Sequence, residues 1–496
     1  MNKSCVWLLK MCGIAILTLG LFTKPIYARK NTQLLCCTIN ILRELYARTS
    51  ETASNTNNIS SEINTLAEIV KNIEELESVE IHCPIILTQA DFGTNGLEIN
   101  DSGYYYLCED IKFTTGSVTA LSIKADYVTV DLNGKSISGA GLENGVVIDS
   151  GLHNIAIKHG TLADFDSIGI EAKSNAHHIL LEGLCLTDAL CDYALSFSVN
   201  YNCKMTNCTV TQCGVKEVGS ETPTVINMHY CSDIDITDCM INKNYNNASS
   251  ENDLYILFLL DCAKCRFIGC HFDDNYDKKI NGNLIVVYAV SSETLDALLF
   301  DHCSFNSNSS LDELRGIYMI NAAGSLIKEC ECNSNSADEN FFGFTHVTSE
   351  DTHTNSIEGC TVSGNIGTGG KGILWGNQCG SSVLHCRVHC NPGTGIEVAG
   401  GNGCVIANCE ANANAGDGVK IESGNDHCIR DCIAMGNGVN GISDSGTNSV
   451  VYGCAAGANN GGNNYNGPVA VCIPQTGSGT AQTTYRYDNV ELTACA

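Results

Sequence analysis

Hydrophobic residues follow two different spacings along this chain. Residues 33–48 and 62–81 carry them at helical spacing, and in the second segment Ile63, Leu66 and Val70 alternate steps of three and four. This pattern predicts two helices joined by the polar linker 49–61. From about Leu97 the pattern changes to short apolar runs of β type, which predict strands for most of the remaining chain.

The β-type runs recur as a unit of the form apolar-x-x-Cys-x-apolar. Successive units lie 22 to 33 residues apart, which marks an internal repeat. The anchor position falls first at Lys135, Gly160 and Leu184, and after that at ten consecutive cysteines. These are Cys208, Cys239, Cys270, Cys303, Cys330, Cys360, Cys386, Cys409, Cys432 and Cys454.

Positions on either side of the anchor support the same register. Three residues before it every unit has an apolar residue, and this alignment places Leu132 of the first unit beside Ile157 of the second. Five residues after it stand nine successive asparagines: Asn244, Asn275, Asn308, Asn335, Asn365, Asn391, Asn414, Asn437 and Asn459. Stacked asparagines can bond to one another along an axis. Asparagine also tolerates the left-handed backbone that a sharp turn needs.

These features predict an all-β solenoid of about thirteen coils, each with three short strands. The period is too short for a unit that contains a helix and too even for a sandwich. One coil cannot bury its own apolar face, so only the stack is stable. At a strand spacing of ~4.8 Å the rod would be about 60 Å long.

The Cys-x-apolar-x-x-Asn ladder and the opening run Tyr127-Val-Thr-Val-Asp-Leu-Asn-Gly-Lys-Ser-Ile-Ser-Gly139 resemble the right-handed parallel β-helix of the pectin-lyase-like superfamily. The similarity covers residues 85–470. It implies a β-helix domain over 83–470. The helical spacing places a helical segment and linker over 29–82, and residues 471–496 are the candidate C-terminal cap, because the open end of a stack must be covered. The superfamily includes polysaccharide lyases, glycosidases, phage tailspikes, adhesins and binding proteins, so the resemblance implies a fold and no single activity.

Composition and the N-terminus bear on where the protein works. The chain has 27 basic and 55 acidic residues, a formal charge of −28, and this balance disfavours nucleic acid as a partner. Residues 1–28 have the basic start, the apolar stretch and the small residue at the end that are typical of a cleaved signal peptide. After cleavage no apolar run is long enough to span a membrane. We expect a secreted, cell-surface or periplasmic protein.

Thirty cysteines in an exported chain raise the question of disulfides. Cysteine is a small residue that is often buried, so we expect the ladder positions to be mainly buried thiols. Cys36 with Cys37, Cys191 with Cys213, and Cys472 with Cys495 are better candidates for disulfides. Zinc at Cys262, Cys265 and Cys270 is the weaker alternative, because Cys270 belongs to the ladder.

Five consecutive coils are longer than the rest, and the extra residues follow the asparagine position in each: 215–222, 245–252, 276–280, 309–315 and 336–340. Insertions at one point of successive coils are expected to stack into a ridge on one edge, as in the binding faces of other solenoids. Its candidate ligand-binding residues are Tyr245, Tyr276, Asp277, Lys278, Lys279, Asp312 and Arg315. The tyrosines could stack on sugar rings, and the acids of the ridge could hold Ca²⁺.

Three functions stay open. The first is a non-catalytic surface protein that binds a polysaccharide through the ridge, and it is favoured because the chain has no Gly-His-Gly and no Arg-x-Pro-x-x-Arg motif. His159, which precedes Gly160, is interpreted as structural. The second is a polysaccharide lyase or glycosidase with an unfamiliar site. The third is a homotrimeric spike or adhesin organised by residues 62–81.

Overall fold

The computed structural model describes residues 84–459 and 464–466, except for 115–117, 216–221, 247–251, 280–281 and 349–353. The chain divides into two compact units, Met1–Ile85 and Ile86–Ala496. The expected signal peptide, the helices at 33–48 and 62–81 and the cap at 471–496 all lie outside the described residues.

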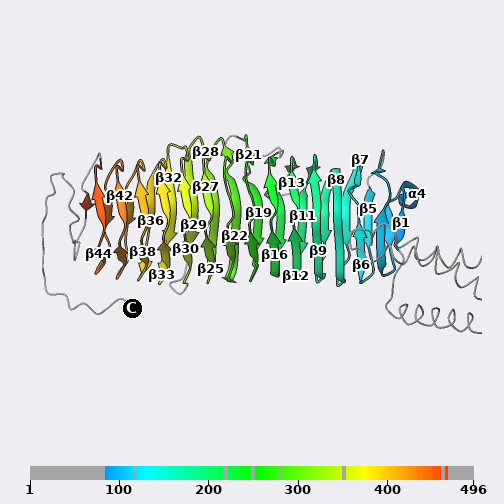
Figure 1. The fold of residues 1–496 in the computed structure, drawn as a ribbon, viewed down its shortest axis with the longest axis horizontal. Coiled ribbons are helices and arrows are strands. Elements are labelled where there is room, and N and C mark those ends of the chain that lie inside the picture. Colours follow the sequence, from blue (N-terminus) through cyan, green and yellow to red (C-terminus); the bar gives the residue numbers. More distant parts are fainter. Residues whose placement is uncertain are drawn as a thin grey trace, which may run out of the picture. The chain divides into compact units, whose positions relative to one another are not determined.

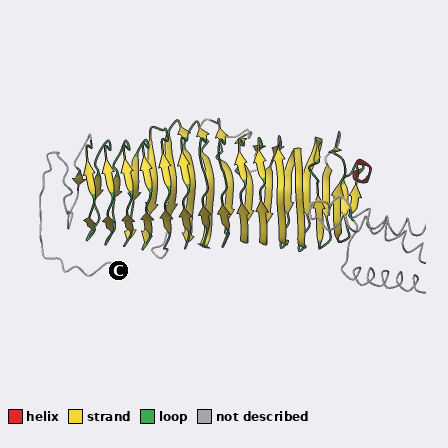
Figure 2. Ribbon diagram, viewed as in Figure 1, coloured by secondary structure: helices red, strands yellow, loops and turns green. Residues whose placement is uncertain are grey.

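The second unit is a β-solenoid of about thirteen turns, in which successive coils follow one another along the axis in sequence order (Figure 1). A single helical turn, α4 (Gln89–Phe92), is the only helix of the described part, and strands and tight turns make up the rest (Figure 2). The strands pair in parallel with their equivalents one coil away. The expected fold class is therefore confirmed.

Most strands belong to one sheet of 32 that runs the length of the solenoid. Its first part holds β1 (Ile85–Leu87), β2 (Leu97–Ile99), β3 (Gly103–Leu107), β4 (Ile111–Lys112), β5 (Val118–Ile123), β6 (Val128–Asp131), β7 (Ser136–Ile148), β8 (His153–Ala172), β9 (His177–Thr187), β11 (Tyr193–Ser198), β12 (Tyr201–Thr206) and β13 (Thr209–Thr211). Its middle part holds β15 (Thr224–His229), β16 (Ser232–Thr237), β17 (Met240–Asn242), β19 (Leu254–Leu260), β20 (Arg266–Ile268), β22 (Leu284–Asp296), β23 (Leu299–Asp301), β25 (Leu314–Ala323), β26 (Leu326–Lys328) and β29 (Asn340–Val347). Its last part holds β30 (Ser356–Glu358), β32 (Gly369–Gly376), β34 (Ser382–Leu384), β36 (Thr394–Val398), β38 (Val405–Ala407), β40 (Val419–Ile421), β41 (Cys428–Arg430), β43 (Ile442–Asp444), β44 (Val450–Tyr452) and β46 (Tyr465–Asn466).

Three smaller parallel sheets complete the coils. One holds β10 (Leu190–Cys191), β14 (Gly214–Val215), β18 (Tyr245–Asn246), β21 (Tyr276–Asp277), β24 (Ser309–Ser310) and β28 (Ser336–Ala337). Another holds β27 (Glu331–Asn333), β31 (Thr361–Ser363), β35 (Arg387–His389), β39 (Glu410–Asn412), β42 (Ile433–Met435) and β45 (Ala455–Gly457). The last pairs β33 (Gln378–Cys379) with β37 (Gly401–Asn402).

The core is a set of rows of identical positions along the axis. Ile236, Phe267 and Phe300 pair in register in three successive coils, and each is fully buried. The predicted register is wrong at one place in the first unit, where Val130 and not Leu132 pairs with Ile157. The turn at Asn133 and Gly134 adds two residues to that corner, so both Val130 and Leu132 still face the core.

The asparagines form the expected ladder. The Nδ2 atom of Asn244 donates to Oδ1 of Asn275 at 3.1 Å, and Asn275 donates in the same way to Asn308 at 3.2 Å. The expected left-handed backbone, however, is not on these asparagines. It falls on the residue before each one, such as Lys243 and Asp274, with φ near 56°. The asparagine turns into the core to complete the buried bonds, and the exposed residue before it makes the turn.

The ladder cysteines are buried free thiols, as expected. Each sulfur lies inside the coil and contacts backbone carbonyls, as Cys270 Sγ does with the Ile236 oxygen at 3.3 Å. Cys191 and Cys213 are also free, so the disulfide expected between them is wrong. Cys191 ends β10 and Cys213 directly precedes β14, so they are not register partners: Cys191 pairs with Val215.

Candidate functional site

The short strands that begin the extra segments of the longer coils lie at one edge of the solenoid. After the asparagine turn the chain forms the short strands β14, β18, β21, β24 and β28, which stack with β10 into a six-stranded parallel sheet. Tyr245 of β18 is the register partner of Tyr276 of β21. Because side chains alternate along a strand, both tyrosines face outward, while Asn246 and Asp277, which follow them, face inward and are buried.

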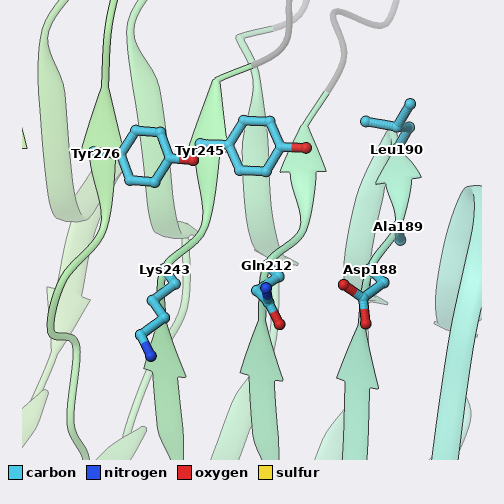
Figure 3. A pocket seen from close by; sticks show the side chains of 7 residues that line it. All are labelled: Asp188, Ala189, Leu190, Gln212, Lys243, Tyr245 and Tyr276. Atoms are coloured by element: carbon cyan, nitrogen blue, oxygen red, sulfur yellow. The ribbon is translucent and has the colours of Figure 1, made fainter.

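The two tyrosine rings form a flat apolar surface. Their centroids are 5.4 Å apart and their planes lie within 6° of each other, an offset arrangement that leaves part of each face uncovered. Figure 3 shows the two rings side by side, with the hydroxyl of each pointing toward the preceding coil. Gly214 makes room for Tyr245, since a Cβ atom at Gly214 would lie 2.6 Å from Cζ of that ring.

A row of polar side chains runs beside the rings. Asp188, Gln212 and Lys243 directly follow β9, β13 and β17, and all three are exposed (Figure 3). Their φ angles of 54°, 56° and 56° are left-handed, so the same turn in three successive coils presents one acid, one amide and one amine on the same edge. Asp188 accepts a hydrogen bond from Thr187 at 3.0 Å.

Rings and polar row together border a hollow of about 470 Å³, here called the tyrosine hollow. It is lined by Asp188, Ala189, Leu190, Gln212, Lys243, Tyr245 and Tyr276 (Figure 3). The sequence pointed to the two tyrosines but missed the polar row and Leu190. A usable signal was present, because Asp188, Gln212 and Lys243 all stand one residue before the inward-facing corner position of their coils.

The other ridge residues of the sequence analysis have different surroundings. Lys278 is exposed and its Nζ lies 4.7 Å from the centroid of the Tyr276 ring, a cation–π contact at the edge of the hollow. Asp277 is buried beneath the rings and accepts a hydrogen bond from the Lys279 backbone N–H at 2.8 Å. Burial raises the pKa of Asp277 to about 6.

Asp312 and Arg315 do not line the tyrosine hollow. The half-buried carboxylate of Asp312 raises the pKa of nearby Glu339 by charge repulsion. Arg315 lies on β25, pairs with Glu313 and packs its guanidinium 4.1 Å from the centroid of the Tyr318 ring. Within the described ranges, no three His, Cys, Asp or Glu side chains are grouped as a metal ion would require, at the ridge or at Cys262, Cys265 and Cys270.

A Ser-His-Asp group on another face is not arranged as a hydrolytic triad. Ser304 Oγ lies 2.8 Å from Oδ2 of Asp273 and 2.8 Å from Nδ1 of His271. The serine has one proton, and the carboxylate of Asp273 can only accept it, so His271 donates to the serine oxygen. In an acyl-transfer site the imidazole instead takes the proton from the serine. His159, interpreted as structural, lies 3.3 Å from the buried carboxylate of Asp131.

The family model for the right-handed beta helix region matches residues 255–402 and 371–467. This match supplies the handedness of the coils. The fold of the solenoid is therefore a right-handed parallel β-helix, as the sequence predicted. No curated protein has significant sequence similarity to the chain.

Several solved structures align with this chain at low identity. The A-module of the Azotobacter vinelandii mannuronan C-5 epimerase AlgE6 matches with a TM-score of 0.39 and 13% identity over 79% of this chain and 100% of its own. Tailspike protein 3 of bacteriophage CBA120 matches with a TM-score of 0.31 and 10% identity over 73% and 48%. PfbA, a surface adhesin of Streptococcus pneumoniae, matches with a TM-score of 0.25 and 11% identity over 75% and 90%. Similarities of this size carry no information about ligand or reaction.

In the part of the chain that the structure describes, no helix is long and apolar enough to cross a membrane.

Proposed function

We propose that this protein binds a glycan in the tyrosine hollow and does not cleave it. The observation that carries the proposal is the pair of parallel rings of Tyr245 and Tyr276 beside a row of hydrogen-bonding groups. Ligand sites are typically concave and apolar, with a few placed polar groups that fix orientation. A sugar ring presents an apolar C–H face to aromatic rings and hydroxyl groups at its rim, and the hollow offers partners for both.

The length of the polar row matches an extended ligand. Asp188, Gln212 and Lys243 occupy three successive coils, so the row extends over two spacings of ~4.8 Å, or about 10 Å. The tyrosines add one further coil in the same direction. A short stretch of polysaccharide lying along the solenoid axis would contact all of these side chains.

Binding without cleavage is supported by the charges that line the hollow. Glycoside hydrolases generally use two carboxyl groups roughly 5 to 9.5 Å apart. The lining residues include one carboxylate, Asp188, and one amine, Lys243. The acid of β21, Asp277, is buried on the opposite side of the strand from the tyrosines, and Asp274, at the equivalent turn of the next coil, is not among the lining residues. The signal-peptide pattern of residues 1–28 supports a site of action outside the cell.

The experiment is an oligosaccharide array followed by calorimetry on the glycans that bind. We expect Tyr245→Ala and Tyr276→Ala each to weaken binding at least about tenfold, and the Phe variants to retain most of it, because the ring face is the contact. Tyr201→Ala is the matched control, since Tyr201 is also partly exposed but lies on β12, away from the hollow.

Two results would overturn the proposal. One is that no glycan on the array binds, or that binding is unchanged in both alanine variants. The other is product formation, measured as new ultraviolet absorbance or new reducing ends when the protein is incubated with the bound glycan. Unsaturated product lost in Lys243→Ala would instead assign a lyase, with Lys243 as the base.

A further inference from the structure

The ring of Tyr245 lies flat on the sheet because the preceding coil lacks a side chain at that point. Gly214 of β14 is the register partner of Tyr245, and a Cβ atom at Gly214 would lie 2.6 to 2.7 Å from the Cζ, Cε2 and hydroxyl oxygen atoms of the tyrosine. Because a Cβ atom points out of the sheet, the Tyr245 ring covers the outer side of Gly214. The ring therefore leans back by one coil, with its other face turned away from the sheet.

The ring of Tyr276 repeats this arrangement one coil further along. Its plane lies within 6° of that of Tyr245, and the two centroids are 5.4 Å apart. This separation is close to the ~4.8 Å between neighbouring coils, so the rings are displaced from each other mainly along the axis. Figure 3 shows both hydroxyls directed toward the preceding coil. The two rings thus form one flat surface that covers two coils.

The neighbours of Gly214 in this outward row all carry side chains. Leu190, which is 46% exposed, is its register partner in the preceding coil and continues the apolar surface there. Between Leu190 and Ile366, Gly214 is the only position of the row without a side chain. The others are Tyr245, Tyr276, Ser309 and Ser336. Gly214 is therefore the point at which a ring from the next coil can lie down on the sheet.

The backward lean brings each apolar group beside one polar group. Figure 3 shows Leu190 near Asp188, the Tyr245 ring near Gln212 and the Tyr276 ring near Lys243. Three successive coils each present one apolar surface and one hydrogen-bonding group, with a repeat of ~4.8 Å. The hollow therefore has three equivalent places along the solenoid axis.

We propose that the tyrosine hollow is specific for an extended, flat polysaccharide whose bonds at C1 and C4 are both equatorial, as in β-1,4-glucans. We further propose that Gly214 is the positioning residue that makes the surface flat. The inference rests on the proposed function, because it names the class of glycan bound at the same site.

The geometry of such a chain matches the three places. Successive sugar rings of an equatorially linked chain lie nearly in one plane, and the rise per sugar is close to the spacing of the coils. Three consecutive sugars can then each contact one apolar surface and one polar group. In an α-1,4-linked chain the planes of successive sugars turn relative to one another, so a flat surface cannot contact several of them at once. The exposed Lys278, whose Nζ lies 4.7 Å from the Tyr276 centroid, can turn to a sugar hydroxyl.

Gly214→Ala should change binding without changing the fold. The atoms that its Cβ would meet belong to the far end of the Tyr245 side chain, which can turn to another rotamer. The ring then leaves the plane of Tyr276, and the flat surface is lost. Gly376→Ala on β32 is the matched control, because its Cβ would lie 3.4 Å from the nearest atom of Val347, which is an ordinary contact.

Calorimetry on the full-length protein tests the class of glycan with hexamers of equal length. The probes are cellohexaose, chitohexaose and β-1,4-mannohexaose, with α-1,4-linked maltohexaose as their counterpart. We expect the best of the three β-1,4 hexamers to bind at least about tenfold more tightly than maltohexaose. Maltohexaose that binds as tightly as the best of them would overturn the glycan class. So would tyrosine-dependent binding of other glycans alone. In both cases the proposed function stands.

The same titrations test the role of Gly214. Gly214→Ala should weaken binding of the best hexamer at least about fivefold, and Gly376→Ala should not. Both variants should melt within a few degrees of the wild type. Adding Gly214→Ala to Tyr245→Ala should weaken binding no further, because the glycine acts through that ring. Unchanged affinity in Gly214→Ala would overturn the positioning role, and the linkage comparison on the wild type does not depend on any variant.

A measurement without ligand separates the positioning role from the proposed function. A crystal structure of Gly214→Ala should show the ring of Tyr245 turned out of the plane of Tyr276. An unmoved ring would refute the positioning role, whatever binds. A displaced ring in a protein that binds no glycan would leave the positioning role intact and remove both the proposed function and the glycan class.

Discussion

The side-chain amide and the backbone N–H of Asn308 both donate to one atom of Asn335. Its side-chain Nδ2 and its backbone N–H each point to Oδ1 of Asn335, at 3.1 Å and 2.9 Å. Asn335 repeats this toward Asn365, at 2.9 Å for both bonds. All three residues are buried, so these bonds satisfy polar groups that water cannot reach. Asparagine-to-asparagine bonds hold the same corner of each coil from Asn244 to Asn459.

Replacing one asparagine of the ladder should therefore lower the free energy of unfolding far more than an ordinary surface substitution does. Asn335→Ala removes the acceptor of the Asn308 backbone N–H and the donor to the Phe305 carbonyl oxygen at 2.8 Å. Because buried groups left unpaired cost about 1–3 kcal/mol each, we expect a loss of roughly 2–4 kcal/mol in the free energy of unfolding. Urea unfolding measures it, with the exposed Asp338→Asn as control. Equal stabilities of the two variants would contradict a structural role for the ladder.

The glycines inside the coils allow a second test of packing. A Cβ atom at Gly343 would lie 2.4 Å from the carbonyl oxygen of Gly372 in the next coil and 2.8 Å from Cγ1 of Val362. Because backbone atoms cannot easily move aside, we expect Gly343→Ala to lower the free energy of unfolding by at least about 2 kcal/mol.

Gly364 is the matched control for this substitution. It has φ of +64° but open space around it, so Gly364→Ala should cost only the backbone strain, about 1 kcal/mol. Thermal unfolding of both variants decides the point. If Gly364→Ala lowered the stability more than Gly343→Ala does, the interior would be able to expand, and backbone contact would not fix the spacing between coils.

Exposed thiols should be alkylated faster than buried ones. Cys108 and Cys390 are exposed, whereas burial raises the pKa of Cys203 to about 12 and of Cys404 to about 11. Because the thiolate is the reactive form, alkylation at pH 8 of the folded protein should label Cys108 and Cys390 well before Cys203 and Cys404. Peptide mass spectrometry follows the order. Ladder cysteines that stay unlabelled in denaturant until reductant is added would reveal disulfides and refute the buried-thiol assignment.

Asp277 should give the stability of the protein a defined pH dependence. Its pKa is raised from 3.8 to about 6 in the folded protein, so the folded state binds this proton more tightly than the unfolded state. The resulting stabilisation is complete below about pH 3.8 and is lost as pH rises through about 6. Relative to Asp277→Asn, the wild-type free energy of unfolding should fall by up to roughly 3 kcal/mol between pH 4 and pH 7.

Urea unfolding at four pH values in this range measures the effect, and Asp338→Asn serves as the control with an exposed carboxyl. Curves of free energy against pH that run parallel for wild type and Asp277→Asn would show that Asp277 does not titrate in this range.

Particular residues show which parts of the fold the sequence could predict. The row from Ile236 to Phe300 and the asparagines from Asn244 onward follow from the repeat alone, because stacked coils must place equivalent residues in equivalent environments. The register of the first repeat unit could not be predicted in this way. Two extra residues at Asn133 and Gly134 shifted Leu132 away from Ile157, and an apolar residue stands at both possible positions, so hydrophobicity could not choose between them.

For the tyrosine hollow too, the sequence determined one part and the tertiary structure another. The sequence by itself determined that Tyr245 and Tyr276 recur at one point of neighbouring coils, and hence that they lie together on one edge. Only the tertiary structure decided that Asp277, one residue further, is buried beneath them, and that Asp188, Gln212 and Lys243 complete the hollow. The physical reason is that a repeat fixes which positions are neighbours along the axis. The direction of each side chain depends on alternation within strands of two residues and on left-handed turns, and these are settled by bonds between coils.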